Sequence, residues 1–242
     1  MDKLRNRPAG QSGFTLIELA VTVAIVGILV GITAVGITGI RPKTQLRDAV
    51  SQLSAILQTA RDRALADNAA VWVGYLPAAS AGADAHVVVY RDWNLNFDPA
   101  TNQTLTAIKS TAGADVETGS CPGTCRRDEV ESVLDIPSRV KGIPPGTFLA
   151  VSDVPDAYKW WGTNLSSVAT APTLGCSFCQ ATYGGNGWLE FLPDGQVRVA
   201  LPTGTPQPKG ALLALGVNDG NAHGASLVTI TLPFGLATEL SQ

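Results

Sequence analysis

Histidine is scarce in this chain, which has two in 242 residues. His86 and His223 have no acidic or nucleophilic pattern beside them, and the Gly-x-Ser-x-Gly, metalloprotease and phosphate-loop patterns are missing. Histidine is the side chain that most often performs acid–base catalysis. The sequence therefore predicts a protein that is not an enzyme. The alternative is an enzyme anchored by its N-terminus. Detection of turnover by the purified soluble domain would favour that alternative.

An excess of basic residues is missing as well. The chain has 17 Lys and Arg against 20 Asp and Glu, a formal net charge of −3. Proteins that bind nucleic acid usually present positive charge to the phosphates. The small basic spot at Arg126 and Arg127 is offset at once by Asp128 and Glu129. Nucleic acid is therefore not expected as a partner.

One long apolar run lies near the N-terminus. From residue 14 to residue 40 the only charged side chain is Glu18, and residues 1–13 form a basic leader. A helix over 14–40 would be roughly 40 Å long, enough to cross a bilayer, and it lacks the Ala-x-Ala exit of a secretory signal. Basic residues stay in the cytoplasm. These features predict a single pass through the membrane, with the rest of the chain in an oxidising, extracytoplasmic space.

The head of this run carries a specific motif. Residues 13–18 read GFTLIE, and a carboxylate in an apolar segment costs several kcal/mol unless it is neutralised, paired or placed at the headgroups. The stretch resembles the type III signal of type IV pilins and type II secretion pseudopilins. The resemblance implies that a prepilin peptidase cuts after Gly13 and that the new N-terminus, Phe14, is N-methylated. It also implies that Glu18 pairs with the amine of a neighbouring subunit in a filament, so that 14–40 is first a transmembrane helix and then a filament-core helix.

A second helical pattern follows the membrane zone. Apolar residues recur at steps of four and three from about residue 44 to residue 68, on one face of a helix that continues over 41–70. Strand-like runs begin at residue 71 and offer a cover for that face. The sequence therefore predicts an α+β fold, in which a long N-terminal helix packs on an antiparallel sheet within a β-rich head, 71–242. The apolar positions are Leu46, Val50, Leu53, Leu57, Ala60 and Ala64.

Turn residues indicate where the strands of the β-rich head begin and end. Pro193-Asp194-Gly195 and the stretch 218–221 separate strand-like runs and predict two hairpins. The segments 110–146 and 155–187 are rich in Gly, Pro, Ser and Thr, and they are expected to be insertions or loops. The expected strands cover 71–76, 86–90, 147–151, 187–192, 196–201, 211–217 and 226–232.

Three short stretches resemble a subgroup of these proteins. Residues 60–65 (ARDRAL), 88–94 (VVYRDWN) and 189–195 (LEFLPDG) are similar to the GspH/FimT group of minor pilins and minor pseudopilins. The resemblance implies a minor pilin that enters a type IV pilus or primes its assembly. A minor pseudopilin of a type II secretion system is the alternative, and a DNA-binding pilin of natural transformation is a further one. DNA-binding relatives carry a glycine-arginine motif near the C-terminus, where 233–237 has no arginine here.

The expected partners follow from the same resemblance. They are the prepilin peptidase, other minor and major pilins or pseudopilins, the inner-membrane assembly platform and a tip adhesin. Tyr158, Trp160 and Trp161 crowd a loop-like stretch, and aromatic side chains are favoured as interface anchors. They are interaction candidates, with packing against the sheet as the alternative.

Four oxygen-bearing side chains recur at every second position in one segment. Asp92, Asn94, Asn96 and Asp98 have the spacing with which a calcium loop begins. Phe97 stands where such a loop needs glycine, and Gln103 stands where it needs glutamate. An Asx-rich turn after a strand is the favoured interpretation, and a bound calcium ion is the lesser one.

The four cysteines form two close pairs. Cys121 and Cys125 are one pair, and Cys176 and Cys179 are the other. Such pairs can hold zinc, but thiols oxidise outside the cytoplasm. Two disulfides that staple the long loops are therefore predicted, and four cysteines permit three connectivities.

Overall fold

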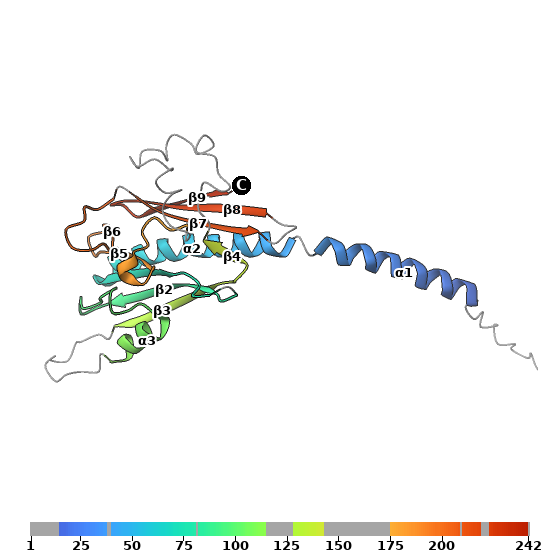
Figure 1. The fold of residues 1–242 in the computed structure, drawn as a ribbon, viewed down its shortest axis with the longest axis horizontal. Coiled ribbons are helices and arrows are strands. Elements are labelled where there is room, and N and C mark those ends of the chain that lie inside the picture. Colours follow the sequence, from blue (N-terminus) through green and yellow to red (C-terminus); the bar gives the residue numbers. More distant parts are fainter. Residues whose placement is uncertain are drawn as a thin grey trace, which may run out of the picture. The chain divides into compact units, whose positions relative to one another are not determined.

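The computed structural model describes residues 15–37, 40–80, 82–114, 128–142, 175–208, 210–218 and 223–241. The chain divides into two compact units, Met1–Arg41 and Pro42–Gln242. The first unit contains α1 (Leu16–Ile37). The second unit, called the head domain below, contains almost all of α2 (Ile40–Asp67) and the described strands (Figure 1).

The helix α2 has the predicted apolar stripe. Every predicted stripe residue from Leu46 to Ala64 is buried, with exposed fractions of 3% or less. The helix begins at Ile40 rather than near Thr44, because Pro42 lies in its first turn, where a missing N–H leaves no helical hydrogen bond broken. It ends at Asp67, and Asn68 follows with a left-handed φ of 51°, a conformation that asparagine tolerates at the end of a helix.

The strands form two antiparallel sheets, whereas the sequence indicated one. The first sheet has the order β3-β2-β1-β5-β6 and the second has the order β4-β7-β8-β9. Both predicted hairpins are confirmed, because β5 pairs with β6 and β7 pairs with β8. The first sheet consists of β1 (Ala70–Leu76), β2 (Ala85–Asp92), β3 (Glu129–Ile136), β5 (Gly187–Phe191) and β6 (Val197–Val199); the second consists of β4 (Val140–Gly142), β7 (Gly210–Asn218), β8 (His223–Thr231) and β9 (Leu236–Ser241).

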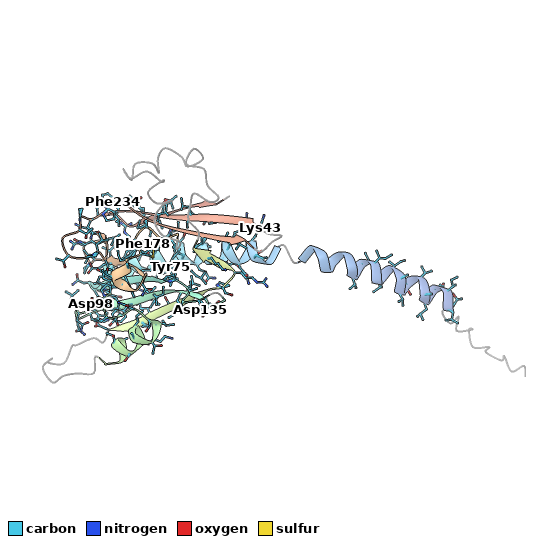
Figure 2. All side chains as sticks on the ribbon, viewed as in Figure 1. Lys43, Tyr75, Asp98, Asp135, Phe178 and Phe234 are labelled. Atoms are coloured by element: carbon cyan, nitrogen blue, oxygen red, sulfur yellow. A yellow bond between two sulfur atoms is a disulfide. The ribbon has the colours of Figure 1, made fainter. Side chains whose placement is uncertain are left out.

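The stripe of α2 lies between the two sheets. Figure 1 shows α2 with β7, β8 and β9 on one side and β2 and β3 on the other. One hydrophobic cluster joins the three elements, with Leu57 of α2, Val73 of β1 and Leu213 of β7 among its members. Figure 2 shows Tyr75 and Phe178, two further members, inside the head domain. The predicted α+β fold, a helix packed on antiparallel β-structure, is confirmed.

A second, aromatic cluster covers the opposite face of the first sheet. Side chains alternate across β1, so that Val71 and Val73 face α2 whereas Trp72 faces away from it. Phe97 fills the centre of the second cluster, with ring centroids 4.5 Å from Tyr90 and 4.8 Å from Trp188. Ile108 of the helix α3 (Leu105–Ala114) completes the cover. Both faces of β1 are therefore buried.

The two segments expected to be insertions contain core residues. The first, 110–146, includes β3 and β4, and Ile136 and Val140 are buried there. In the second, 155–187, Cys176 and Phe178 join the core. The prediction for 110–146 was wrong because buried and exposed side chains do not alternate strictly along β3. This strand lies at an edge of the first sheet and carries acidic residues there. The predicted strand at 147–151 lies outside the described residues.

A buried arginine fixes the end of α2 to the first sheet. Arg91 of β2 is 9% exposed and forms ion pairs with Asp67 at 3.4 Å, with Glu129 at 3.1 Å and with Glu131. Glu131 also accepts from Arg63 of α2 at 3.5 Å. A buried charge needs paired partners, and here they come from the helix α2 and the strand β3.

One edge of the first sheet is occupied by a side chain. The amide of Gln207 forms both hydrogen bonds that a strand would form with Val199: its Oε1 accepts from the N–H at 2.9 Å and its Nε2 donates to the carbonyl at 2.9 Å. The carbonyl of Pro233, from the turn between β8 and β9, accepts from the N–H of Val197 at 2.7 Å. Edge backbone groups that are satisfied in this way cannot pair with another strand.

We expect Gly74→Ala to lower the free energy of unfolding by about 1–3 kcal/mol through overpacking. A Cβ on Gly74 would lie 2.4 Å from the indole ring of Trp188, its cross-strand neighbour. Chemical denaturation followed by tryptophan fluorescence measures the change. Gly224→Ala, also in a strand, is the matched control, because its Cβ would meet atoms no closer than 3.5 Å. Equal stability of the two variants would contradict the packing described for Trp188.

Candidate functional site

The residues predicted for processing and assembly lie at the head of α1. Gly13 and Phe14 are outside the described residues, which begin at Thr15. Thr15 immediately precedes the helix, and Glu18 is the acidic residue of its first turn. The geometry of the site therefore rests on these two side chains.

Thr15 and Glu18 cap the helix reciprocally. The carboxylate Oε2 of Glu18 accepts from the N–H of Thr15 at 2.9 Å and from its hydroxyl at 2.8 Å. The N–H of Glu18 donates in turn to Oγ1 of Thr15 at 3.4 Å. This arrangement is a capping box, which satisfies backbone donors that a helix leaves unpaired at its start. The Thr-x-x-Glu spacing is the sequence signature of this box, which the charge of Glu18 alone does not predict.

The capping box leaves one oxygen of the Glu18 carboxylate available as a hydrogen-bond acceptor. Both hydrogen bonds to Glu18 use Oε2, so Oε1 can accept from a further donor. Negative charge is stabilised at a helix N-terminus, and positive charge is destabilised there. A cut after Gly13 would create an amine at Phe14, next to the capping Thr15. Glu18 is the only charged side chain within 14–40 that could offset such an amine.

The described surface of α1 is apolar on every side. Its large apolar side chains up to Val30 are 52% to 87% exposed, and Figure 2 shows side chains projecting from the N-terminal part of the helix. Exposed apolar surface of this extent marks an interaction with lipid or protein. In the described part of the chain, which covers the predicted span 14–40 incompletely, no helix is both long and apolar enough to cross a membrane. The exposed residues are Leu16, Ile17, Leu19, Val21, Val23, Ile25, Val26, Ile28, Leu29 and Val30.

Comparison with known families identifies this region. Residues 8–34 match the prokaryotic N-terminal methylation motif. The methylation motif includes the predicted cut after Gly13 and the capping box, and it supports a type IV pilin-like or pseudopilin protein. This class is structural and non-enzymatic, and the motif implies a prepilin peptidase and other pilins as partners. No curated protein and no solved structure matches the chain.

The predicted calcium loop is built around one buried carboxylate. Asp92 is 2% exposed, and its Oδ1 accepts from the N–H of Asn96 at 3.1 Å. Its Oδ2 accepts from the N–H of Phe97 at 3.1 Å and from the indole N–H of Trp72 at 3.2 Å. A carboxylate that accepts three N–H groups of the protein holds the loop as an Asx-type turn and directs Phe97 into the aromatic cluster.

The other predicted ligands also serve the turn. Oδ1 of Asp98 accepts from the N–H of Ala100 at 2.9 Å, and Asn94 and Asn96 are exposed. The N–H of Asn94 donates to Asp128 at 3.2 Å, which ties the loop to the residue before β3. Among the described residues, no group of three or more His, Cys, Asp or Glu could hold a metal ion. Calcium binding stays a prediction.

The remaining candidates fall partly outside the described residues. Cys121 and Cys125 lie there, as do the aromatic candidates Tyr158, Trp160 and Trp161. Cys176 and Cys179 form a disulfide with an S–S distance of 2.07 Å. This disulfide does not simply staple a peripheral loop as expected, because Cys176 is 2% exposed and belongs to the core.

His86 has an acidic partner that the sequence analysis missed. Its Nδ1 lies 2.8 Å from Oδ1 of Asp135, and the two residues are cross-strand neighbours on β2 and β3. Forty-nine positions separate them in the chain, so no local pattern could show the contact. The pair is on an exposed part of the sheet and adds a polar cross-strand contact.

We expect Asp92→Ala to lower the free energy of unfolding by about 2 kcal/mol or more, because three donors lose their acceptor. Denaturant titration in the presence of a chelator measures the loss. Asn96→Ala is the matched control: it keeps the backbone N–H that Asp92 accepts and should change stability by less than about 0.5 kcal/mol. A calcium-dependent rise in the unfolding midpoint that both substitutions abolish would overturn the Asx-turn interpretation.

Proposed function

We propose that this protein is a minor pilin of the GspH/FimT type, which is processed by prepilin peptidase and enters a type IV pilus or primes its assembly. The observation that carries the proposal is the capping box of Thr15 and Glu18, within the methylation motif, at the head of an apolar and exposed helix. A minor pseudopilin of a type II secretion system would use the same helix in the same way.

Before processing, the protein is held in the inner membrane by residues 14–40. The basic leader, residues 1–13, stays on the cytoplasmic side and the head domain lies in the periplasm. Hydrolysis of the peptide bond after Gly13 leaves a carboxylate on Gly13 and an amine on Phe14. Methylation of that amine keeps its positive charge, so the anchored helix begins with a cation and carries Glu18 one turn later.

Assembly then pairs opposite charges between neighbouring subunits. In an apolar surrounding, an unpaired ammonium and an unpaired carboxylate are both costly, and their attraction is strong at short range. Glu18 of one subunit accepts from the Phe14 amine of the next through Oε1, while Oε2 continues to cap its own helix. The pairing favours entry into the filament and fixes the axial register between helices.

The head domain suits a subunit present in few copies. It spans residues 42–242, and the chain as a whole is acidic. A bulky head is harder to repeat along a shaft than at a tip. Contact with an assembly platform would use the membrane helix, whereas Tyr158, Trp160 and Trp161 are the proposed contacts for another minor pilin or a tip adhesin.

Two substitutions separate the charge of Glu18 from its capping role. Glu18→Gln keeps an acceptor for Thr15 but removes the charge, whereas Thr15→Val removes the two capping hydrogen bonds of the hydroxyl and keeps both the backbone donor and the charge. We expect the Gln variant to be cut after Gly13 normally and to enter filaments at least about tenfold less, the equivalent of 1.4 kcal/mol. The Val variant should retain most of its assembly. Mass spectrometry reports processing, and immunoblotting of sheared filaments reports incorporation.

The reverse pattern would refute the charge-pairing mechanism. If Thr15→Val loses incorporation while Glu18→Gln assembles normally, the carboxylate acts only as a helix cap. If neither variant is cut after Gly13, the motif is not a processing site at all, and the proposed function fails with it.

A further inference from the structure

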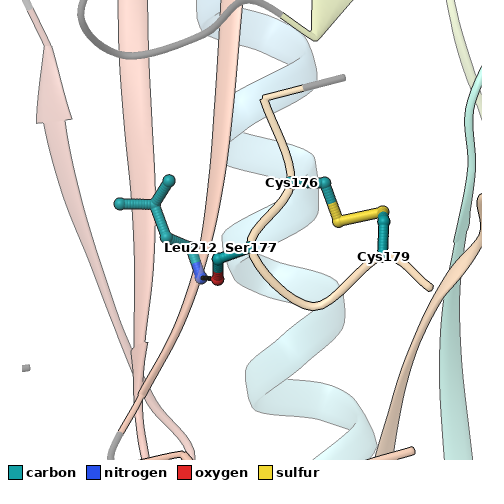
Figure 3. The surroundings of a disulfide bond; sticks show 4 residues. All are labelled: Cys176, Ser177, Cys179 and Leu212. Atoms are coloured by element: carbon teal, nitrogen blue, oxygen red, sulfur yellow. Dashed lines mark hydrogen bonds between the residues drawn. A yellow bond between two sulfur atoms is a disulfide. The ribbon is translucent and has the colours of Figure 1, made fainter. Parts of the chain in front are cut away.

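The Cys176–Cys179 disulfide lies in a loop that bridges the two sheets of the head domain. This loop, residues 175–180, is called the clasp loop below. Cys176 forms an isolated β-bridge with Leu213 of β7, in the second sheet. Cys179 forms one with Gly187 of β5, in the first sheet. Figure 3 shows the disulfide close to β7, where Ser177 contacts Leu212.

Three hydrogen bonds hold one end of the clasp loop to β7. The carbonyl of Gly175 accepts from the N–H of Ala214 at 2.7 Å, and the N–H of Ser177 donates to the carbonyl of Leu212 at 2.9 Å. The hydroxyl oxygen of Ser177 accepts from the N–H of Leu212 at 2.8 Å (Figure 3). The loop thus satisfies backbone donors of β7 that β8 does not reach.

The other end of the clasp loop fits tightly against β5. The N–H of Gln180 donates to the carbonyl of Asn186 at 3.0 Å. Gly187 leaves room for the loop, because a Cβ there would lie 2.6 Å from the ring of Phe178 and 2.9 Å from the sulfur of Cys179. Phe178 itself is buried in the core that the sheets share with α2.

The disulfide closes the loop between these two attachments. Strands β5 and β7 belong to different sheets and do not pair with each other. The covalent bond therefore fixes the spacing between a residue bridged to β7 and a residue bridged to β5. In the reduced state, only hydrogen bonds and packing would hold the two attachments at that spacing.

We propose that the Cys176–Cys179 disulfide is a redox-sensitive clasp that holds the second sheet to the first around α2. A dithiol reductant is the chemical class that opens it. Its thiolate attacks the sulfur of Cys179, which is half-buried, and the sulfur of the buried Cys176 leaves as a thiolate. The second thiol of the reductant then displaces Cys179. Two electrons and two protons pass to the protein, which gains two thiols, and the reductant becomes a cyclic disulfide.

A general stabilising role makes a different prediction. A disulfide that closes a loop of a few residues removes little entropy from the unfolded chain, and whatever it contributes is shared by the whole cooperative unit. A clasp instead changes local opening where the loop attaches, and amide exchange resolves such local opening from global unfolding. The position of the change in exchange therefore separates the two roles.

The test uses the full chain in detergent micelles with Cys121→Ser and Cys125→Ser, so that reduction can act only on Cys176 and Cys179. Amide hydrogen exchange is measured before and after dithiothreitol. We expect the amides of Leu212 and Ala214 to exchange at least about tenfold faster after reduction, while amides of β1 and β2 keep their rates. Unchanged rates at Leu212 and Ala214, or equal acceleration throughout the head domain, would overturn the proposal.

Ser177→Ala provides an independent control with the disulfide intact. It removes the side-chain acceptor of the Leu212 N–H and leaves the bond between Gly175 and Ala214 in place. We expect faster exchange at Leu212 alone, and the further acceleration of Ala214 only upon reduction. Acceleration of Ala214 in the oxidised Ser177→Ala protein would show that the hydrogen bonds, and not the disulfide, hold the loop.

Discussion

The burial of one helix stripe between two sheets is the constraint on which the head domain depends. The apolar positions of α2 recur at steps of four and three, and they belong to one hydrophobic cluster with residues of both sheets. The first sheet covers one side and the second sheet covers the other. Both sheets must therefore keep their inner faces apolar. Arg91 fixes the end of α2 to the first sheet, and the clasp loop joins the first sheet to the second.

The end of β2 carries opposite charges on the two faces of the strand, at Arg91 and Asp92. Arg91 points toward α2 and finds carboxylates there, whereas Asp92 points to the other face and accepts three N–H groups. Adjacent residues of a strand face opposite ways, so the two charges do not neutralise each other and each organises a separate contact. The first fixes the end of α2, and the second shapes the loop that carries Phe97 into the aromatic cluster.

The sequence predicts the parts of this structure that local periodicity encodes. The stripe of α2, the strands β1, β2, β5, β7 and β8, and both hairpins could be read from spacing and turn residues. The strand β3, the helix α3 and the division into two sheets could not, since they depend on contacts between distant segments, as His86 with Asp135 illustrates. At the candidate site, residues 13–18 could be assigned from the motif, and the Thr-x-x-Glu spacing within it is also the signature of the capping box that Thr15 and Glu18 form.

The side chain of Gln207 matters for how such a protein behaves at high concentration. At high concentration, an open strand edge on each head domain would allow edge-to-edge pairing and uncontrolled fibre growth. The side-chain amide of Gln207 forms the two hydrogen bonds with Val199 that the backbone of a neighbouring strand would form. The β6 edge of the head domain is therefore closed to the addition of a strand from another molecule.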